Sequence, residues 1–504
     1  MTAAGKAETR SGRGFDRSRA TFDSLVGLLE GAEAGGLSHS ELEDRLQVEG
    51  RELLRQLFQD HLDLRADRER RAAVVDADGV ARQTVESGRC RGLASVFGRL
   101  EVRRLAYRAR GACDLHRADA LLNLPVERHS HGLRRLAAIE SSRGSFEDAA
   151  AAVGRATGQR LGKRQIEDLA GRAACDFDAF YEQRAATAAV PADVLVISCD
   201  GKGVVMRHDA LRPATAKAAA DGTTKLKTRL SKGEKRNRKR MAEVGAVYDA
   251  TPVPRTAADV MPATETERDA ATAGPVATGK WLTATVTRDA ADMIGDVFDE
   301  AERRDSGHER EWVALVDGNN HQIQRIQAEA KARGTPVTIV IDFVHVIEYL
   351  WKAAWSLHQE GDPAAEDWVR RHAQAVLDGR ATTVAGNIRR AATRAGLDGP
   401  RRAGADTAAK YLTNKHQHMN YPTALANGWP IATGVIEGAC RHLVNDRMDI
   451  TGARWGLPGA EAILKLRAIV SNDDFDAYWR FHLAQEHLRV HRSRFANTEI
   501  PHVA

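Results

Sequence analysis

Five short apolar runs between residues 194 and 341 constrain the fold of this 504-residue chain more than any other feature. Three runs come first, and a helical stretch, the fourth run, a second helical stretch and the fifth run follow. Short apolar runs bounded by turn residues are typical of buried strands. This order predicts one mixed α/β sheet. The expected strands are 194–199, 244–249, 281–287, 312–316 and 337–341, and the expected helices between them are 290–303 and 322–333.

The same order of elements is that of the RNase H-like fold, in which the first three strands form a meander and the fourth pairs in parallel with the first. Residues 344–433 then follow a mainly helical pattern, and 436–448 is expected to be a helix that resumes the core. We therefore predict an α/β RNase H-like core with a mixed five-stranded sheet, interrupted by an all-helical insertion.

The region before the sheet has its own signals. Residues 96–108 alternate like a short hairpin with basic residues on one face. A helix opens at Ser145 and ends near Gly154, and after a glycine turn a second helix begins with Lys163 and Arg164. This pair fits a DNA-binding helix-turn-helix, but a helical hairpin packed into a core has the same pattern, so both interpretations stay open.

These patterns predict a mainly helical DNA-binding region ahead of the core. The expected boundaries are 1–20 for a disordered tail, 21–90 for a helical N-terminal region, 91–188 for the hairpin and helix-turn-helix-like DNA-binding region, 189–343 for the first part of the core with a basic loop at 207–243, 344–433 for the helical insertion, 434–490 for the C-terminal helices of the core and 491–504 for a tail.

Composition excludes several classes of protein. No apolar run approaches the roughly 18 residues that cross a bilayer, and the first residues lack the apolar stretch of a secretory signal. The five cysteines are scattered without a CxxC pair, which argues against a disulfide framework and a structural zinc site. We expect a cytoplasmic protein, nucleoid-associated in a bacterium, with no membrane partner.

One segment concentrates positive charge, although the whole chain has a net charge of only +5. Residues 225–240 hold nine basic residues and one acidic residue. Such a run is often only a solvated segment, but within a predicted sheet domain it favours contact with a nucleic-acid backbone. The candidates in this run are Lys225, Lys227, Arg229, Lys235, Arg236, Arg238, Lys239 and Arg240. Lys202 and Arg441 are further candidates for phosphate contacts.

Two aspartates follow strands that the predicted topology makes neighbours. Asp200 is expected to end the first strand and Asp317 the fourth, each directly before a glycine. An acid before glycine is often only a turn residue. Neighbouring strands lie ~4.8 Å apart, however, so carboxylates at the same ends of adjacent strands can share a metal ion. Two such sites together favour metal binding.

Glu437 is the third candidate acid, on the predicted helix 436–448. It lies at the edge of that helix's apolar stripe and can face the edge of the sheet. An i,i+4 ion pair with Arg441 is the simpler interpretation of Glu437 taken alone. Three oxygen-bearing acids suit two Mg²⁺ ions, which can activate a water or a 3′-hydroxyl and stabilise the leaving oxygen of a phosphodiester.

The chain resembles the bacterial ISKra-type insertion-sequence transposases, which are DDE enzymes distantly similar to Mutator-like transposases. The most specific motifs are RMDITGARW at 447–455, GAEAILKLR at 459–467 and DAYW at 476–479. Further stretches of likeness are 118–125, 143–147, 194–207, 313–355 and 434–481. The resemblance implies metal-dependent DNA cleavage and strand transfer at the ends of a mobile element, with Asp200, Asp317 and Glu437 as ligands of the two ions.

The resemblance leaves the middle acid open between two residues. Asp342 follows the fifth strand, roughly 10 Å from the first by the sheet spacing, so we prefer Asp317. Asp342 and His345 are similar to the Asp-x-x-His element that Mutator-like transposases carry before their helical insertion. They would order the insertion or contact DNA, unless His345 is a hydrogen-bonded core residue.

Trp455, beside an arginine, could stack on an unpaired base, but a core position is the favoured interpretation. The expected partners are the element's terminal repeats, target DNA and further copies of the chain, since two DNA ends must be held together. Two alternatives remain: an RNase H-like endonuclease without strand transfer, and a catalytically inactive, transposon-derived DNA-binding protein.

Overall fold

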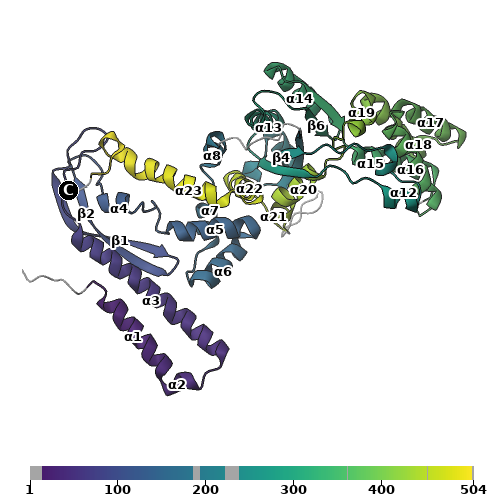
Figure 1. The fold of residues 1–504 in the computed structure, drawn as a ribbon. Coiled ribbons are helices and arrows are strands. Elements are labelled where there is room, and N and C mark those ends of the chain that lie inside the picture. The colour runs from purple at the N-terminus through teal and green to yellow at the C-terminus, as the bar shows by residue number, and fades with distance from the viewer. Residues whose placement is uncertain (1–13, 185–192, 222–237, 360, 451, 502–504) are drawn as a thin grey trace, which may run out of the picture. The chain divides into compact units, whose positions relative to one another are not determined.

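A computed structural model describes residues 14–184, 193–221, 238–359, 361–450 and 452–501 (Figure 1). The chain divides into two compact units. The first combines residues up to Glu182 with those from Asp474 onward, and the second runs from Gln183 to Asp473. None of the helices in these ranges combines the length and apolarity needed to span a bilayer.

The second unit contains the predicted five-stranded mixed sheet. Its strands are β3 (Val194–Val205), β4 (Lys239–Ala250), β5 (Ala277–Thr285), β6 (Trp312–Val316) and β7 (Val337–Ile341). They lie in the order β5-β4-β3-β6-β7, with the first three antiparallel and β6 and β7 parallel to β3. The predicted meander and the parallel pairing of the fourth strand with the first are therefore confirmed.

Helices complete the core on the sheet. α13 (Ala290–Arg304) packs on β3 and β4, and α14 (Asn320–Arg333) packs on β6 and β7. Gly245 makes room for α13, because a Cβ there would lie 2.6 Å from Val297 and 2.7 Å from the Met293 sulfur. α22 (Leu457–Ser471) packs on β5. Every residue of β6 is buried, as expected for a central strand covered on both faces.

Two boundaries around the first strand differ from the prediction. β3 does not end at Cys199 but continues to Val205, because its second half pairs with β4 alone. Asp200 and Gly201 look like a turn in the sequence, yet they lie inside this extension. The predicted basic loop 207–243 includes η1 (His208–Ala210) and α9 (Pro213–Asp221), and its residues from Lys239 onward belong to β4; residues 222–237 lie outside the described ranges.

The predicted helical insertion follows β7. Its helices are α15 (Phe343–Leu357), α16 (Pro363–Leu377), α17 (Ala381–Arg394), α18 (Gly399–Lys415), η2 (His416–His418) and α19 (Tyr421–Ala426). The shorter α11 (Ala257–Val260) and α12 (Glu265–Ala270) precede β5, and α11 packs against α16. The helix predicted over 436–448 is present as α20 (Gly434–Ala439), a π-helical turn η3 (Cys440–Asn445) and α21 (Asp446–Met448).

The first unit begins with helices that run further toward the N-terminus than predicted. Its first helix, α1 (Asp16–Glu30), includes residues 16–20, which we expected to be disordered; residues 1–13 lie outside the described ranges. α2 (Ala32–Gly35) and the long α3 (His39–Arg68) follow. Ser38 caps α3 through a reciprocal hydrogen-bond pair with Glu41.

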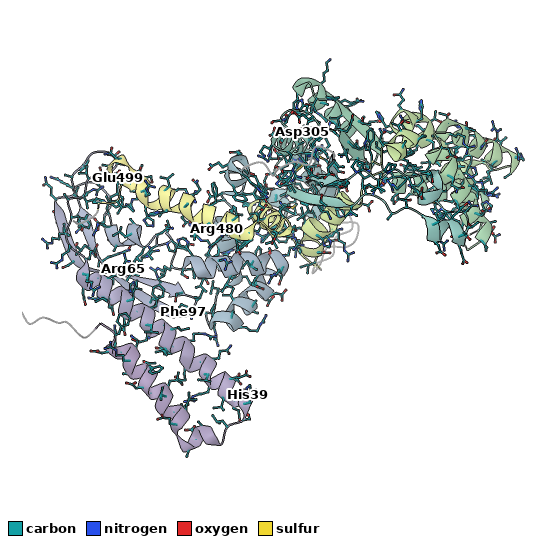
Figure 2. The ribbon with its side chains drawn as sticks, viewed as in Figure 1. His39, Arg65, Phe97, Asp305, Arg480 and Glu499 are labelled. Atoms are coloured by element: carbon teal, nitrogen blue, oxygen red, sulfur yellow. The ribbon has the colours of Figure 1, made fainter. Side chains whose placement is uncertain are left out.

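The hairpin is longer than predicted. β1 (Thr84–Ser95) pairs with β2 (Gly98–Arg108), and Phe97 lies at the turn (Figure 2). The region 21–90 is thus helical only as far as Arg68. The prediction missed β1 because its residues Thr84 to Gly92 are polar, and most of them are exposed.

Three helices of this unit form a small cluster: α5 (His131–Arg143), α6 (Phe146–Thr157) and α7 (Lys163–Ala173). Leu133, Val153 and Ile166 are buried at its centre. The two predicted short helices are therefore present, although α6 ends at Thr157, where Gly158 adopts φ +71°. α4 (Arg117–Leu121) precedes the cluster and α8 (Phe177–Gln183) follows it.

The C-terminal residues belong to the first unit, which corrects the predicted boundary at 490. α23 (Phe475–Glu486) is not part of the sheet domain; its Tyr478 hydroxyl donates to the Ala173 carbonyl at 2.6 Å. The π-helical η4 (His487–His491), η5 (Arg492–Arg494) and η6 (Ala496–Thr498) follow. Phe495 is buried and bridges Asp76, so residues 491–501 are packed rather than a free tail.

Candidate metal site at the sheet edge

Three aspartates occupy equivalent register positions across neighbouring parallel strands: Asp317 and Asp342 directly follow β6 and β7, and Asp200 lies within β3 where its pairing with β6 has ended. Ser198 pairs with Leu315, and Val316 pairs with Ile341. Continued by one or two residues, this register places Asp200, Asp317 and Asp342 in one row across β3, β6 and β7. With strands ~4.8 Å apart, Asp317 is in the middle and has an aspartate on either side.

Asp317 is held by a turn and by the helical insertion. The Asn319 backbone N–H donates to Asp317 Oδ1 at 2.8 Å, and the Tyr411 hydroxyl donates to the Asp317 carbonyl at 2.9 Å. The Tyr411 ring stacks on Tyr349 with 3.9 Å between centroids. One helical turn after Tyr411, the Lys415 ammonium donates to the Asn320 side chain. The loop after β6 is therefore fixed by α18.

Asp342 is fully buried and begins the insertion as the N-cap of α15. Its Oδ1 accepts the Val344 N–H at 2.9 Å, and its Oδ2 accepts the Thr433 hydroxyl at 2.5 Å. The Nδ1 of His345 lies 3.6 Å from the same Oδ2, and the interaction with Asp342 raises the pKa of His345. That Nδ1 atom is buried and has no hydrogen-bond partner among the described residues.

Glu437 joins this pair from α20, which packs on β3 and β4. Its Oε1 accepts a long 3.5 Å hydrogen bond from Thr433, the residue that also contacts Asp342. Ligand atoms of Asp342, His345 and Glu437 all lie within 4.8 Å of one another. The structure therefore brings one predicted metal ligand together with the two predicted accessory residues.

Asp200 and Asp317 are not part of that group, so the three predicted ligands do not surround a single point in the described residues. Asp200 nevertheless lies beside the helix that carries Glu437. The Cys440 thiol, one turn after Glu437, donates to Asp200 Oδ2 at 3.3 Å, and the Gly201 N–H donates to Oδ1 at 2.7 Å. Burial, followed by the charge of Asp200, raises the pKa of the Cys440 thiol.

The carboxylates at this edge lack basic counter-charges. In the part of the chain that the structure describes, these four acids form no ion pair with a lysine or arginine: Asp200, Asp317, Asp342 and Glu437. The only ion pair that any of them makes there is that of Asp342 with His345. Lys415 on α18 is a buried cation whose pKa is lowered by burial, an effect that the charge of Asp317 opposes. An acidic edge of this kind favours a bound cation, because clustered carboxylates repel one another.

The simpler interpretation of Glu437 does not hold in the described residues. The exposed Arg441 lies 3.7 Å from Asp446 instead of pairing with Glu437. The physical reason is the π-helical turn that begins at Cys440, because it changes the spacing between these residues. Glu437 keeps an exposed carboxylate beside Thr433.

Trp455 has a structural role, which contradicts the prediction that it contacts a DNA base. It is 5% exposed, its indole N–H donates to the Met448 carbonyl at 3.0 Å, and Arg447 lies over its ring at 4.7 Å. Its backbone bridges Met206 just after the end of β3. The favoured core interpretation of this tryptophan therefore agrees with its position.

The predicted basic contacts differ in their surroundings. Lys225, Lys227, Arg229, Lys235 and Arg236 lie outside the described residues. Lys202 and Lys239 are exposed and Arg238 is half-buried. Arg240 is half-buried and donates to the Val286 carbonyl at 2.5 Å, so it is partly engaged within the protein. In the first unit, the exposed Lys163 pairs with Glu147 at 2.7 Å and Arg164 is exposed.

Sequence reasoning missed the residues that support the acids. Thr433, Cys440, Tyr411 and Lys415 all come from segments distant from the sheet strands. Thr433 has a weak local signal, since it lies four residues before Glu437, but its contact with Asp342 depends on the tertiary fold. Nothing in the local pattern of Tyr411 or Lys415 indicates a contact with the loop after β6.

A second group of metal-ligating types occurs in the first unit, formed by Cys175, Asp176 and His482. The Asp176 carboxylate accepts a hydrogen bond from the Arg489 guanidinium at 2.8 Å and another from the His482 Nδ1–H at 2.7 Å. These partners hold the pKa of Asp176 well below its usual range despite burial. A carboxylate already neutralised by an arginine does not favour a cation, so this group is a structural ion-pair network.

Comparison with known proteins supplies no relative for this site: no protein-family model matches the chain, and no curated protein matches it either.

Proposed function

We propose that this chain is a DDE-type DNA transposase of a bacterial insertion sequence, with an RNase H-like core, that cuts DNA at the ends of its element and joins them to target DNA in the cytoplasm. One observation carries the proposal. The strand order β5-β4-β3-β6-β7 and its register align Asp200 with Asp317 across adjacent parallel strands, and α20, which packs on β3 and β4, carries Glu437.

The donor set fits hard divalent cations. Mg²⁺ and Mn²⁺ take oxygen ligands, and Asp200, Asp317 and Glu437 would hold two such ions. The carboxylates described above, which lack lysine and arginine partners in the described residues, support this fit. When bound, the two ions supply the charge that activates a water or 3′-hydroxyl and stabilises the leaving oxygen.

The chain's own residues keep the carboxylates in place. Cys440 orients the Asp200 side chain, the Asn319 N–H orients that of Asp317, and Tyr411 holds the backbone of the same loop. Asp342 and Thr433 link the start of the insertion to α20, so that Glu437 is positioned from the side of the insertion. Preorganisation of this kind reduces the reorganisation needed during phosphoryl transfer.

The DNA would be bound by basic side chains outside the acidic edge. Lys202 is exposed two residues after Asp200, and the basic segment 225–240 leads into β4. Lys163 and Arg164 at the start of α7 would contact element DNA in the first unit. Because transposition joins two ends in one event, we further propose that the chain acts as a homo-oligomer.

The test of the site is nicking of supercoiled plasmid by the full chain in Mn²⁺, which requires no knowledge of the element's ends. Asp200→Asn, Asp317→Asn and Glu437→Gln should each lower the initial rate by about 100-fold or more, since each removes a ligand charge. Asp406→Asn is the matched control, because Asp406 is an exposed acid on α18 that pairs with Arg402. Full activity of Asp200→Asn would contradict the site.

The same assay decides between the two candidates for the middle acid. If Asp317 is the ligand, Asp317→Asn abolishes nicking, while Asp342→Asn retains a measurable rate and loses folding stability, because Asp342 is buried and hydrogen-bonded. The reverse pattern of rates would assign the ion to the group of Asp342, His345 and Glu437.

Strand transfer separates a transposase from a nuclease on the same fold. Duplexes that bind the protein are first selected from a random-sequence library, then cut to leave a 3′-hydroxyl and incubated with plasmid and Mn²⁺. A transposase joins the labelled end to the plasmid, whereas an endonuclease only cuts. Absence of joining with every selected end would overturn the transposase assignment and leave the metal site intact.

A further inference from the structure

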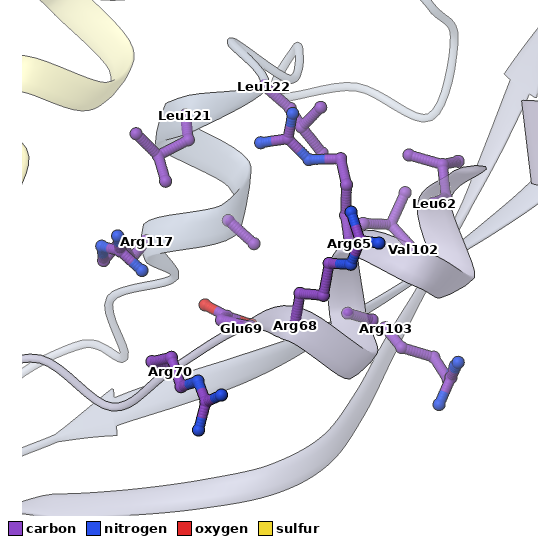
Figure 3. Close-up of a pocket in the computed structure, with 12 residues that line it drawn as sticks. Leu62, Arg65, Arg68, Glu69, Arg70, Val102, Arg103, Arg117, Leu121 and Leu122 are labelled. Carbon is purple, nitrogen blue, oxygen red and sulfur yellow. The ribbon is translucent and has the colours of Figure 1, made fainter. Parts of the chain in front are cut away.

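The first unit contains an arginine-rich pocket of about 370 Å³ (Figure 3). It lies between the C-terminal end of α3, strand β2 and helix α4. Five of its lining side chains are arginines and one is a glutamate. The arginines are Arg65, Arg68, Arg70, Arg103 and Arg117. A cavity of this size falls within the range that holds a small organic ligand.

Two of these arginines have uncommitted positive charge. Among the described residues, neither Arg65 nor Arg68 forms an ion pair or a side-chain hydrogen bond, and both are exposed near the end of α3 (Figure 3). Arg103, in contrast, pairs with Asp63 and Asp67. Cations in the last turn of a helix also offset its dipole. Arg117 comes from α4, but it is buried and its Nε donates to the Pro501 carbonyl, so Arg65 and Arg68 supply the available positive charge. The mouth of the pocket is therefore suited to an anion.

The interior of the pocket has a different character. Leu62 and Val102 are buried apolar residues, and Leu121 closes the opposite side. Glu69 brings a carboxylate into this space: its Oε2 accepts the Leu105 N–H at 2.9 Å, while its Oε1 is buried without a hydrogen-bond partner in the described residues. Burial raises the pKa of Glu69. A buried acceptor without a partner favours a ligand that donates an N–H.

We propose that this pocket binds one nucleotide, with its phosphate on Arg65 and Arg68 and an amino-bearing base against the apolar wall, donating to Glu69. The pocket combines an anion site, an apolar slot and a buried acceptor, and a nucleotide carries the matching three parts. That the nucleotide belongs to a DNA end rather than being free rests on the proposed function. Thymine lacks an exocyclic amino group and offers Glu69 only its N3–H, on a different edge geometry from an amino group, so a thymidine nucleotide should bind most weakly.

The test measures binding by the full chain in EDTA, so that it is independent of metal-dependent catalysis. The probes are dGMP, dAMP, dCMP, dTMP and inorganic phosphate, together with labelled duplexes that are blunt or carry a single-stranded end. The Arg65→Ala/Arg68→Ala double variant should weaken nucleotide binding by at least tenfold, since it removes two charge-assisted contacts. Arg45→Ala, on the same helix and paired with Glu49, is the control.

Glu69→Gln tests the base contact. It should reduce binding of dGMP, dAMP and dCMP by about tenfold and change that of dTMP little, with circular dichroism confirming that the variant folds. Binding of free nucleotides, or of single-stranded ends only, supports the pocket and identifies the source of the nucleotide. Equal binding of phosphate and all four nucleotides, or wild-type binding by the double arginine variant, would overturn it. Asp200→Asn should bind as the wild type does, which separates this proposal from failure of the catalytic site.

Discussion

Each unit of the molecule gathers residues of metal-ligating type, and the two groups differ in how their charges are balanced. In the first unit, Asp176 and Glu486 are buried beside Arg489 and Arg134, and His482 lies between them. At the sheet edge of the second unit, the carboxylates lack arginine and lysine partners in the described residues, and the one ion pair is that of Asp342 with His345. Ligand type alone therefore does not identify a metal site; the absence of internal neutralisation is the better guide.

The largest effect is expected from breaking the balanced group. Arg134 is fully buried and bonds Glu127, Glu486 and His482. Arg134→Met leaves the buried Glu486 without its arginine and the half-buried Glu127 with Arg172 alone, which should cost about 3–5 kcal/mol of folding free energy. Urea unfolding measures the loss, and hydrogen exchange should locate it in α5 and α23. Unchanged exchange in these helices would show that the network is not structural.

An intermediate effect is expected from adding a cation to the unbalanced group. Mn²⁺ at about 100 times its dissociation constant should stabilise the second unit by roughly 2.7 kcal/mol, because the ion binds only the folded state. Hydrogen exchange of β3, β6 and α20 with and without Mn²⁺ measures this directly. Glu437→Gln should reduce the protection, and the first unit should show none, so equal protection of Cys175–Asp176 would remove the distinction between the two groups.

The smallest effect concerns the hydroxyl that links the acidic edge to the insertion. Thr433→Val removes the donor to the fully buried Asp342 while keeping the shape of the side chain. An unsatisfied buried acceptor should cost about 1–3 kcal/mol. Thr433→Ser retains the hydroxyl and should recover most of that loss in urea unfolding. Similar stability of the valine and serine variants would show that this contact does not hold the site together.

The strands of the second unit were predictable because their burial is written into local pattern. Runs such as Trp312–Val316 are apolar at every position, and the structure buries every one of them. The ends of the strands were harder to predict than their centres. The Asp200–Gly201 dipeptide has the local chemistry of a turn, and only its pairing with β4 keeps it in a strand.

The partners of an element were harder to predict than its existence. The predicted core extends to residue 490 and therefore includes α23, which the structure places in the first unit. Tyr478 and His482 in fact contact Ala173 and Asp176 in the first unit, and no periodicity in α23 indicates that choice. In the candidate site, the row of aspartates followed from the strand topology. The contacts of Thr433 with Asp342 and of Tyr411 with Asp317 depend instead on how the helical insertion packs, which local sequence pattern does not indicate.

The π-helical turn η3 lies between Glu437 on α20 and Trp455, whose backbone meets the chain at the end of β3. A π-turn accommodates one extra residue, and each residue advances a helix by about 100°. Deleting a residue there would rotate everything downstream relative to Glu437, so that either the acid leaves the sheet edge or Trp455 no longer meets the end of β3. The π-helical turn allows Glu437 and Trp455 both to keep their positions. This explains why a helical geometry with poorer hydrogen bonds occurs at that point of the chain.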